Sequence, residues 1–526
     1  MNRRLGPCGS AVICFSTVAD LGMTMMISYR STPTTKLTDS EIEQCSALFS
    51  NHYGTYGVDD PKGRSGDHIR MKPEYYKARY VRENYNVALA MDSDTIVGQA
   101  FYIRERLDEG VYTWVLQLVV HKDYRRRGIA GRLLHSIWGF SNDCAWGLAT
   151  TNPFTVKTLE SATLRHADPK QIKEHMALVK KICDRIPYIE ELFIDDTGSK
   201  AFTNFFVETE GLSGYPLLNE FNMILGKLEP GEEWVAFTFR DQDYDEDFIE
   251  ELKKAISYSE DVLKEAYGRM DMGMHPWARH TSEEIDAIES VIGPMDDMGI
   301  LDAGCGHGRH SLEIARRYRS SHVTGIDFSE SNIMRAKEQQ GVLTNVEFRI
   351  GDLKEPVDGR FDLILCLYDV IGSFPQIEDN ELILGNLYES CKDGGDLVLS
   401  VMNMESTLAS AKRENIVDVE EHPEVLFNLP ASDIMQTTGD IFDPDHYVVD
   451  DVHGIVYRKE QFAEEGSLPS EYVIRDRRFT MQEITSLVES AGFRVVLTRY
   501  VQSGRWDTPL DATDKKAKEI LLVAKK

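Results

Sequence analysis

The pattern of hydrophobic and polar residues differs between the two halves of this chain. In the first half, short apolar runs are separated by turn residues, such as Asp92-Ser93-Asp94 and Asp108-Glu109-Gly110. These runs predict three successive strands and then a helix. The strands are expected over 87–91, 95–103 and 113–120, the helix over 131–138, and later strands over 201–207 and 233–239.

In the second half, strand and helix patterns alternate. Strands are expected over 299–303, 322–327, 346–350 and 361–367, with helices over 311–318 and 329–340. Such alternation predicts a parallel sheet with helices on both faces. A further helix is expected over 281–292, where Ile285, Ile288 and Ile292 share a face and Thr281 and Glu284 form a capping box.

The change between the halves coincides with a run of carboxylates over 241–247, which is typical of a solvated surface. We therefore expect one domain over 27–240, a linker with the first helices of the next domain over 241–298, and a second domain over 299–526. Residues 404–478 exceed a usual connection between strands and contain strand-like stretches, 447–449 and 455–458. They are predicted to form a lid inserted in the second domain.

Residues 1–26 have a separate character. Arg3 and Arg4 precede a short apolar stretch, which faintly resembles a signal peptide. We expect instead that the segment is disordered or lies upstream of the true start at Met23, Met25 or Met26.

A glycine-rich loop follows the first strand of the second half. Asp302 ends that strand, and Gly304-Cys305-Gly306-His307-Gly308 leads into a helix. Glycines here let the backbone turn tightly and approach a ligand. Asp327 ends the next strand, where a carboxylate can hold both hydroxyls of a ribose. Asp352 follows the third strand and can accept a hydrogen bond from an adenine amino group.

The spacing separates this loop from the Gly-x-Gly-x-x-Gly fingerprint of nicotinamide-binding domains. The third glycine comes one residue early, and an acid precedes the first. Over residues 260–526 the chain resembles the class I S-adenosylmethionine-dependent methyltransferases. The resemblance implies a Rossmann-like fold that binds S-adenosylmethionine through Asp302, Gly304, Gly306, Gly308, Asp327 and Asp352.

The acceptor region follows the fourth strand, at residues 367–374. It lacks the Asn-Pro-Pro-Tyr or Asp-Pro-Pro-Tyr motif of the methyltransferases that act on nucleic-acid and protein amino groups, and is more similar to the small-molecule N- and O-methyltransferases. Tyr368 and Asp369 are the candidate catalytic residues that contact the acceptor, although they equally fit a cap of the strand. Arg475, Arg477 and Arg478 fit either an acidic substrate group or, preferably, ion pairs with the chain's own carboxylates.

In the first half, a strand breaks into a basic loop that opens a helix. Successive backbone N–H groups at such a point bind a pyrophosphate. Arg125, Gly128 and Ala130 fill the Arg/Gln-x-x-Gly-x-Gly/Ala signature, so that residues 27–240 resemble the GNAT acetyltransferases, with a mixed-sheet α+β fold. The resemblance implies binding of acetyl-coenzyme A through Leu118, Val120, Arg125, Arg126, Gly128, Ala130, Gly131 and Asn152.

Two departures from the GNAT pattern affect transfer rather than binding. Gln117 stands where many of these enzymes have a glutamate base, and Leu159, Glu160 and Ser161 stand where many have a tyrosine acid. Catalysis would then use water or Glu160. Otherwise the domain binds acetyl-coenzyme A without turnover or presents a substrate.

Composition narrows the partners. The formal net charge of −29 disfavours nucleic acid as a partner, because such binding depends on neutralising phosphates. None of the eight cysteines has C-x-x-C spacing, so that we expect no metal site and a cytoplasmic protein. No apolar run approaches the ~20 residues of a membrane span, and no membrane association is expected.

The leading hypothesis is a bifunctional tailoring enzyme that methylates a small molecule, free or bound to a carrier, and acylates it from acetyl-coenzyme A. The alternative is a methyltransferase acting on nucleic acid or protein, with a non-catalytic GNAT-like binding module. A third possibility is that the first half serves only for binding or oligomerisation.

Overall fold

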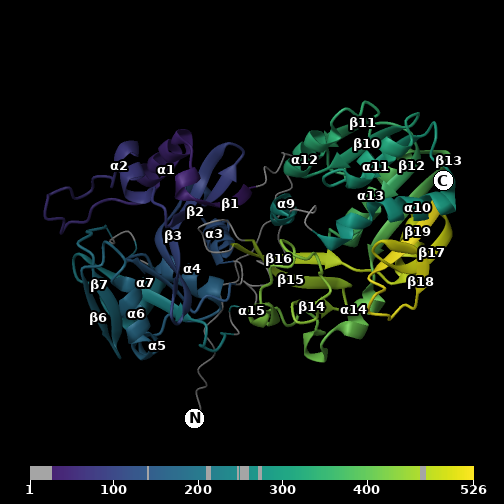
Figure 1. Ribbon diagram of the computed structural model, residues 1–526. Coiled ribbons are helices and arrows are strands. Elements are labelled where there is room, and N and C mark those ends of the chain that lie inside the picture. The colour runs from purple at the N-terminus through teal and green to yellow at the C-terminus, as the bar shows by residue number, and fades with distance from the viewer. Residues whose placement is uncertain are drawn as a thin grey trace, which may run out of the picture.

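The computed structural model describes residues 27–526 apart from 139–140, 209–211, 213–214, 246–247, 249–259, 271–274 and 463–469. The expectations for residues 1–26 lie outside this range. The described chain forms an α+β lobe from its first half and a Rossmann-like α/β lobe from its second half, with a smaller sheet between them (Figure 1).

The first lobe is built on an eight-stranded sheet in the order β1-β2-β3-β4-β5-β8-β7-β6. All neighbouring strands are antiparallel except β4 and β5. The strands are β1 (Ile27–Pro33), β2 (Tyr85–Asp92), β3 (Thr95–Leu107), β4 (Gly110–Val120), β5 (Ala145–Thr150), β6 (Glu191–Asp195), β7 (Gly198–Phe202) and β8 (Glu232–Phe239).

Helices cover both faces of this sheet. Helices α1 (Asp39–His52) and α2 (Pro73–Tyr80) pack on one face, and α3 (Ile129–Trp138) and α4 (Pro153–Thr163) on the other. The later helices are α5 (Pro169–Glu174), α6 (Met176–Cys183) and α7 (Pro216–Ile224). The strand predicted over 201–207 lies too late in the sequence, because the observed strand β7 runs from Gly198 to Phe202.

Strands β4 and β5 separate part-way along their length. They pair only from Tyr112 opposite Ala145 to Val115 opposite Leu148. Beyond this point β4 pairs only with β3, and β5 only with β8. A register shift in the β3–β4 pairing begins at the point where β4 and β5 separate. It leaves Leu116 of β4 without an opposite residue on β3. The sheet thus opens beside the basic loop that follows β4.

The second lobe has an eight-stranded sheet in the order β11-β10-β9-β12-β13-β19-β17-β18, parallel from β11 to β13 and antiparallel beyond. The strands are β9 (Gly299–Ala303), β10 (His322–Asp327), β11 (Val346–Ile350), β12 (Phe361–Cys366), β13 (Cys391–Met402), β17 (Arg494–Gln502), β18 (Arg505–Leu510) and β19 (Glu519–Lys525).

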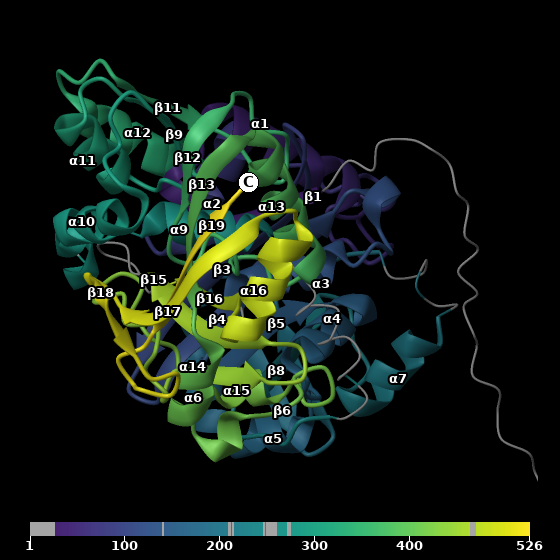
Figure 2. The same ribbon diagram turned by 90° about the vertical axis from the view of Figure 1, so that its right-hand side faces the viewer.

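Figure 2 shows helices on both sides of this sheet. One layer contains α10 (Thr281–Ile292), α11 (Arg309–Arg317) and α12 (Glu330–Gln340), and the other contains α9 (Glu260–Arg269), α13 (Ile377–Ser390) and α16 (Met481–Ser490). Helix α10 was predicted at its observed bounds, but the capping box was wrong. Thr281 Oγ1 donates to the carbonyl of Ala278, and Glu284 contacts residues of α11 instead.

Residues 404–478 contain a three-stranded antiparallel sheet of their own, which we call the lid sheet. Its strands are β14 (Tyr447–Asp450), β15 (Ile455–Phe462) and β16 (Ser470–Arg477), preceded by α14 (Met404–Ser410) and α15 (Val425–Asn428). A buried ion pair joins β15 to β16, since Arg458 lies 3.0 Å from Asp476. Arg478, directly after β16, pairs with the same carboxylate at 2.9 Å.

The lid sheet also contacts the first lobe. Lys459 Nζ donates to Asn142 Oδ1 at 3.1 Å and to the carbonyl of Phe427 at 3.3 Å, and Arg240 donates to the same carbonyl at 3.4 Å. Leu164 and Phe427 pack together beside these bonds. The two halves, although separate in sequence, thus share a contact through this insertion.

Short 3-10 helices occur at Thr34–Lys36, Lys122–Tyr124, Pro276–His280 and Arg413–Asn415. Among the residues that the structure describes, no helix combines the length and the apolar character needed to cross a membrane.

Candidate active site

The glycine-rich loop of the second lobe is fixed by its own surroundings. Gly304, Gly306 and Gly308 have φ angles of 76°, 53° and 81°, which side-chain-bearing residues rarely adopt. A Cβ on Gly304 would lie 2.3 Å from Val370 Cγ2, and one on Gly308 would lie 2.7 Å from the Phe348 ring. These two glycines are therefore required by packing inside the lobe, a reason that the sequence pattern did not reveal.

The carboxylates predicted at the strand ends hold this loop in place. Asp302 accepts hydrogen bonds from the backbone N–H of Ser311 at 3.1 Å and from its hydroxyl at 2.6 Å. Asp327 accepts from the N–H of Gly306 at 2.8 Å and, on its other oxygen, from the N–H of Ser329 at 2.9 Å. Burial raises the pKa of Asp327 above the usual aspartate range.

Asp352 is less constrained than the other two acids. One oxygen accepts from the N–H of Lys354 at 3.0 Å, and Lys264 Nζ lies 3.6 Å from the other. Its half-buried carboxylate faces the same cavity as Asp302 and Asp327. The ends of three neighbouring parallel strands thus bring the three acids together, as expected for this topology.

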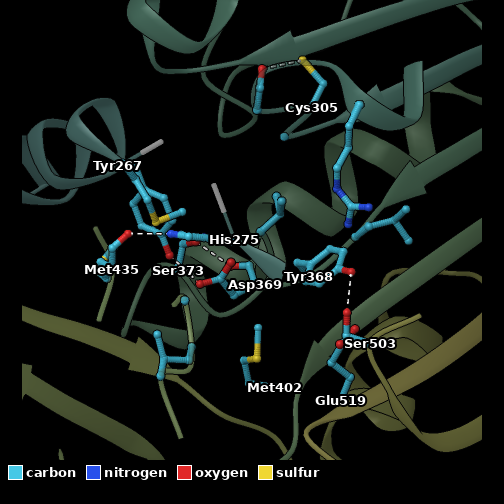
Figure 3. Close-up of a pocket in the computed structure, with 18 of the residues that line it drawn as sticks. Tyr267, His275, Cys305, Tyr368, Asp369, Ser373, Met402, Met435, Ser503 and Glu519 are labelled. Carbon is cyan, nitrogen blue, oxygen red and sulfur yellow. Dashed lines mark hydrogen bonds between the residues drawn. The ribbon is translucent and has the colours of Figure 1, made fainter. Parts of the chain in front are cut away.

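A cavity of about 660 Å³ extends from these acids to the lid sheet. Of the residues predicted to bind S-adenosylmethionine or to contact the acceptor, all except Gly308 line it. The far wall comes from the insertion, with Met435, residues 438–442 and Arg458, and from the C-terminal region, with Gln502, Ser503, Lys515, Lys516, Lys518 and Glu519. Figure 3 shows Met435, Ser503 and Glu519 among the side chains of this wall.

Tyr368 lies at the turn after β12 in an unusual conformation. Its φ of 66° is rare for a bulky side chain, and such strain concentrates at functional sites. Its backbone N–H donates to Ser400 Oγ at 2.5 Å, its hydroxyl donates to Glu284, and that hydroxyl lies 3.2 Å from Ser503 Oγ. Burial raises the pKa of Tyr368 well above its usual range, so that the phenol stays neutral.

Asp369 lies next to Tyr368 and faces α9. It accepts a hydrogen bond from the hydroxyl of Tyr267, and burial raises the pKa of its carboxyl. Both predicted acceptor contacts thus form part of the cavity wall, and their side chains make bonds beyond the end of β12 (Figure 3).

Glu284 supports this wall although it does not line the cavity. It is fully buried and accepts from Arg309 Nη1 at 2.6 Å, His310 Nε2 at 2.8 Å, the Tyr368 hydroxyl and the N–H of Gly504 at 3.2 Å. These donors outweigh burial and lower the pKa of Glu284 to about 2. Its helical spacing suggested only a cap, because its partners come from distant segments.

The arginines at the base of the lid do not line the cavity. Arg478 pairs with Asp476, and Arg477 Nε donates to the carbonyl of Pro375 at 2.8 Å. The ion-pair interpretation therefore holds for Arg478. The arginines that do line the cavity are Arg309 and Arg458.

Asp418, Asp450 and His453 bring three potential metal-ligand atoms within 4.8 Å of one another in the insertion. His453 Nδ1 lies 2.9 Å from Asp450 Oδ2, and Asp418 accepts from the backbone N–H groups of Glu420 and Glu421. These hydrogen bonds account for the arrangement of the cluster.

The basic loop of the first lobe is more open than the loop of the second. Arg126 and Gly128 have φ angles of 62° and 75°, and Arg125 donates to the carbonyls of Val120 at 3.1 Å and His52 at 2.5 Å. A Cβ on Gly128 or Gly131 would meet no protein atom within 4 Å. The start of α3, at Ile129, is therefore accessible to a ligand.

The other residues predicted to bind acetyl-coenzyme A flank this opening. Leu118 and Val120 lie on the part of β4 that pairs with β3 but not with β5, and they pack, partly buried, against the core under α3. Ala130 lies in the first turn of that helix. Asn152 ends the stretch after β5 and caps α4, accepting from the N–H of Phe154 at 2.9 Å.

The residues considered for acyl transfer have structural roles. Gln117 is buried and accepts from the Tyr76 hydroxyl at 2.6 Å and from Gln99 Nε2 at 2.7 Å. Glu160 is also buried, accepts from the N–H of Ala167 at 3.0 Å, and lies 3.4 Å from His166. The carboxylate of Glu160 thus bonds to the segment that follows α4, and its use as a base, like the route through water, stays a prediction.

Sequence families match both lobes. Residues 294–461 match a methyltransferase domain family, and residues 55–149 match the GNAT acetyltransferase family. The chain joins a GNAT-family domain to a methyltransferase domain. The resemblances inferred from the two glycine motifs are thereby confirmed.

Individual relatives match parts of the chain. A trans-aconitate 2-methyltransferase of Deinococcus radiodurans is 33% identical over 102 residues, which are 19% of this chain and 37% of that protein. A malonyl-(acyl-carrier protein) O-methyltransferase of Bacillus cereus is 29% identical over 108 residues, which are 20% of this chain and 38% of that protein. The chain thus spans less than half the length of these relatives.

Among solved structures, the CcbJ methyltransferase of Streptomyces caelestis aligns with 47% of this chain and 88% of its own, at 14% identity and a TM-score of 0.34. The glycopeptide N-methyltransferase MtfA aligns with 47% of this chain and 89% of its own, at 16% identity and a TM-score of 0.31.

Proposed function

We propose that the second lobe transfers a methyl group from S-adenosylmethionine to a small molecule. The observation that carries this proposal is that one continuous cavity joins two regions. The first is the glycine-rich loop with Asp302 and Asp327, and the second is the space under the lid sheet. Its volume of about 660 Å³ lies within the range of cofactor and ligand sites.

The residues present fit S-adenosylmethionine. Each oxygen of Asp327 accepts one backbone N–H, which leaves lone pairs for the two ribose hydroxyls. Asp352 has acceptor capacity for the adenine amino group. When bound, the sulfonium supplies an activated methyl group. The protein has to hold the acceptor in line with that methyl and exclude water, because alignment provides much of the rate.

The volume and lining of the acceptor compartment, which is the part of the cavity beside Tyr368 and Glu519, favour a small molecule over a polymer. Residues 438–442 line it, and Lys518 pairs with Asp440 across the boundary between the insertion and the C-terminal region. The net charge of −29 also disfavours nucleic acid. One methyltransferase relative is named for a small molecule, trans-aconitate, and the other for a malonyl group that is attached to acyl-carrier protein. The first supports a small acceptor, and the second supports a small acceptor group presented on a carrier.

For the first lobe we propose binding of acetyl-coenzyme A. The pyrophosphate would meet the N–H groups at the start of α3, and the pantetheine arm would lie in the opening between β4 and β5. Acyl transfer to the same small molecule would make the chain bifunctional. Binding without turnover is the second candidate, favoured by the structural roles of Gln117 and Glu160.

The decisive test is the identity of the bound molecules. Native mass spectrometry of the purified full chain should detect S-adenosylmethionine or S-adenosylhomocysteine, and a small metabolite should co-purify. Calorimetry with S-adenosylhomocysteine and with acetyl-coenzyme A then tests each lobe separately. Failure of the first titration would refute the methyltransferase proposal, whatever the second shows.

We also propose a reducing compartment, such as the cytoplasm. Six cysteines in the described part of the chain are free, and burial raises the pKa of thiols such as Cys183, to about 12, which suits inert buried groups.

A further inference from the structure

Glu519 is a buried carboxyl group in the acceptor compartment that the sequence did not single out. It is the first residue of β19, which runs antiparallel to β13 and pairs with it so that Glu519 lies opposite Met402. Because β13 ends near that residue, Glu519 lies at the same edge of the sheet as the ends of the parallel strands. The residue is 3% exposed, and it lines the cavity together with Tyr368 and Ser503 (Figure 3).

The hydrogen bonds of Glu519 are incomplete. Ser400 bonds to its carboxyl group, and Ser400 Oγ in turn accepts from the N–H of Tyr368. The second oxygen, Oε2, is buried and has no hydrogen-bond partner among the described residues. A buried polar atom without a partner is costly in a folded protein. In a cavity wall, such an atom indicates a partner that comes with the ligand.

Two glutamates in this region have opposite electrostatic surroundings. Glu284 is saturated with donors, which hold it ionised. Around Glu519, burial and the negative charges of Glu284 and Asp369 oppose ionisation, whereas the positive charge of Arg309 and the Ser400 hydroxyl favour it. The opposing influences are stronger, and they raise the pKa of Glu519 to about 8. A pair of carboxyl groups with separated pKa values is the arrangement that assigns proton transfer to one of them.

On the basis of the proposed methyltransferase function, we infer that Glu519 binds the nucleophilic nitrogen of an amine acceptor and serves as its general base. An ammonium group that enters the cavity supplies the countercharge that ionises Glu519, whose proton leaves to solvent. The ammonium then transfers one proton to Oε2. The freed lone pair forms the N–C bond while the C–S bond breaks, and the electron pair of that bond stays on sulfur.

The same surroundings disfavour a carboxylate as acceptor. Of the cationic groups that line the cavity, Arg309 pairs with Glu284, Arg458 pairs with Asp476 and Lys518 pairs with Asp440. Lys515 and Lys516 also line it, but they are exposed to solvent, which screens their charge. A carboxylate beside Glu519 would add a negative charge where one more is already unfavourable. An amine instead satisfies the unpaired oxygen and brings the missing positive charge.

Calorimetry on the full chain tests this inference with two probes of similar size and opposite charge, benzylamine and benzoate. The protein is first titrated with S-adenosylhomocysteine, so that failure of the proposed function shows as failure of this first titration. The saturated protein should then bind benzylamine at least about tenfold more tightly than benzoate. In Glu519→Gln, which keeps the shape of the side chain, S-adenosylhomocysteine affinity should be unchanged and the preference for the amine should disappear.

Two controls separate a general base from a structural residue. Glu489→Gln makes the same change on the exposed face of α16, outside the cavity, and should keep the preference. Titrations of benzylamine in two buffers of different ionisation enthalpy should show proton release from the wild type and none from Glu519→Gln. Equal or tighter binding of benzoate, no measurable binding of millimolar benzylamine, an unchanged preference in Glu519→Gln, or no proton release would each overturn the inference.

Discussion

The glycine loops of the two lobes occupy equivalent places but have different surroundings. Each follows a strand and opens a helix, and each was expected to approach a nucleotide. In the second lobe, a Cβ on Gly304 or Gly308 would collide with Val370 or Phe348. In the first lobe, a Cβ on Gly128 or Gly131 would enter open space.

This difference shows that one sequence signal has two physical causes. Gly304 and Gly308 of the second loop are required by packing within the lobe, even without a cofactor. Gly128 has a positive φ that favours glycine, but Gly131 lies inside α3 with neither strain nor a neighbour to explain it. The remaining explanation for a glycine at position 131 is a ligand that binds at the start of α3. Substitution of the glycines in each loop can test the two explanations.

The largest effect is expected for Gly304→Ala. A positive φ and overlap with the stiff Val370 side chain should lower the free energy of unfolding of the second lobe by roughly 4 kcal/mol. Urea denaturation measures this loss. Gly385→Ala is the matched control, because Gly385 lies in α13 with open space around it. Equal stability of the two variants would contradict the role of packing.

A smaller effect is expected for Asp327→Ala. Loss of the ribose contacts and of the bond to Gly306 should weaken S-adenosylhomocysteine binding by roughly 3 kcal/mol, or about a hundredfold. Calorimetry provides the affinity. Glu330→Ala, on the exposed start of α12, should bind as the wild type does. Unchanged affinity in the Asp327 variant would refute the assignment of the cofactor site.

In the first lobe, Gly128→Val should abolish stabilisation by acetyl-coenzyme A. A ligand at about 100 times its dissociation constant adds roughly 2.7 kcal/mol, which a thermal-shift assay detects. The valine fills the space at the helix start and strains the loop, while S-adenosylhomocysteine binding by the second lobe should be unaffected. If the wild type shows no shift with millimolar acetyl-coenzyme A, the first lobe is a binding or oligomerisation module for something else.

The smallest effect, and the sharpest test of the comparison, is expected for Gly131→Ala. Alanine is the better helix former, so that the first lobe should gain about 0.5–1 kcal/mol of stability. Its affinity for acetyl-coenzyme A should nevertheless fall, because the added methyl group lies at the proposed pyrophosphate site. Calorimetry and urea denaturation of the same variant measure the two changes. A stabilised variant with full affinity would remove the ligand as the reason for this glycine.

The local elements were largely predictable. Helix α10 and strands β9, β10 and β11 have the bounds that periodicity predicted, because short apolar runs next to glycines and acids leave few alternatives. Strand β7 was misplaced, since its pairing with β8 rather than its own pattern decides where it ends. Glu284 was misassigned as a cap because local spacing cannot show that Arg309, His310 and Tyr368 converge on it.

The sequence by itself determined the two families and the acids at the strand ends, because parallel strands bring their carboxyl ends to one edge whatever surrounds them. Only the tertiary structure decided which residues form the cavity wall that faces these acids. Glu519, Ser503 and residues 438–442 approach Tyr368 from segments far along the chain. Their burial, missing hydrogen bonds and mutual charges exist only after these segments pack together, so that no local pattern encodes the chemistry of the acceptor compartment.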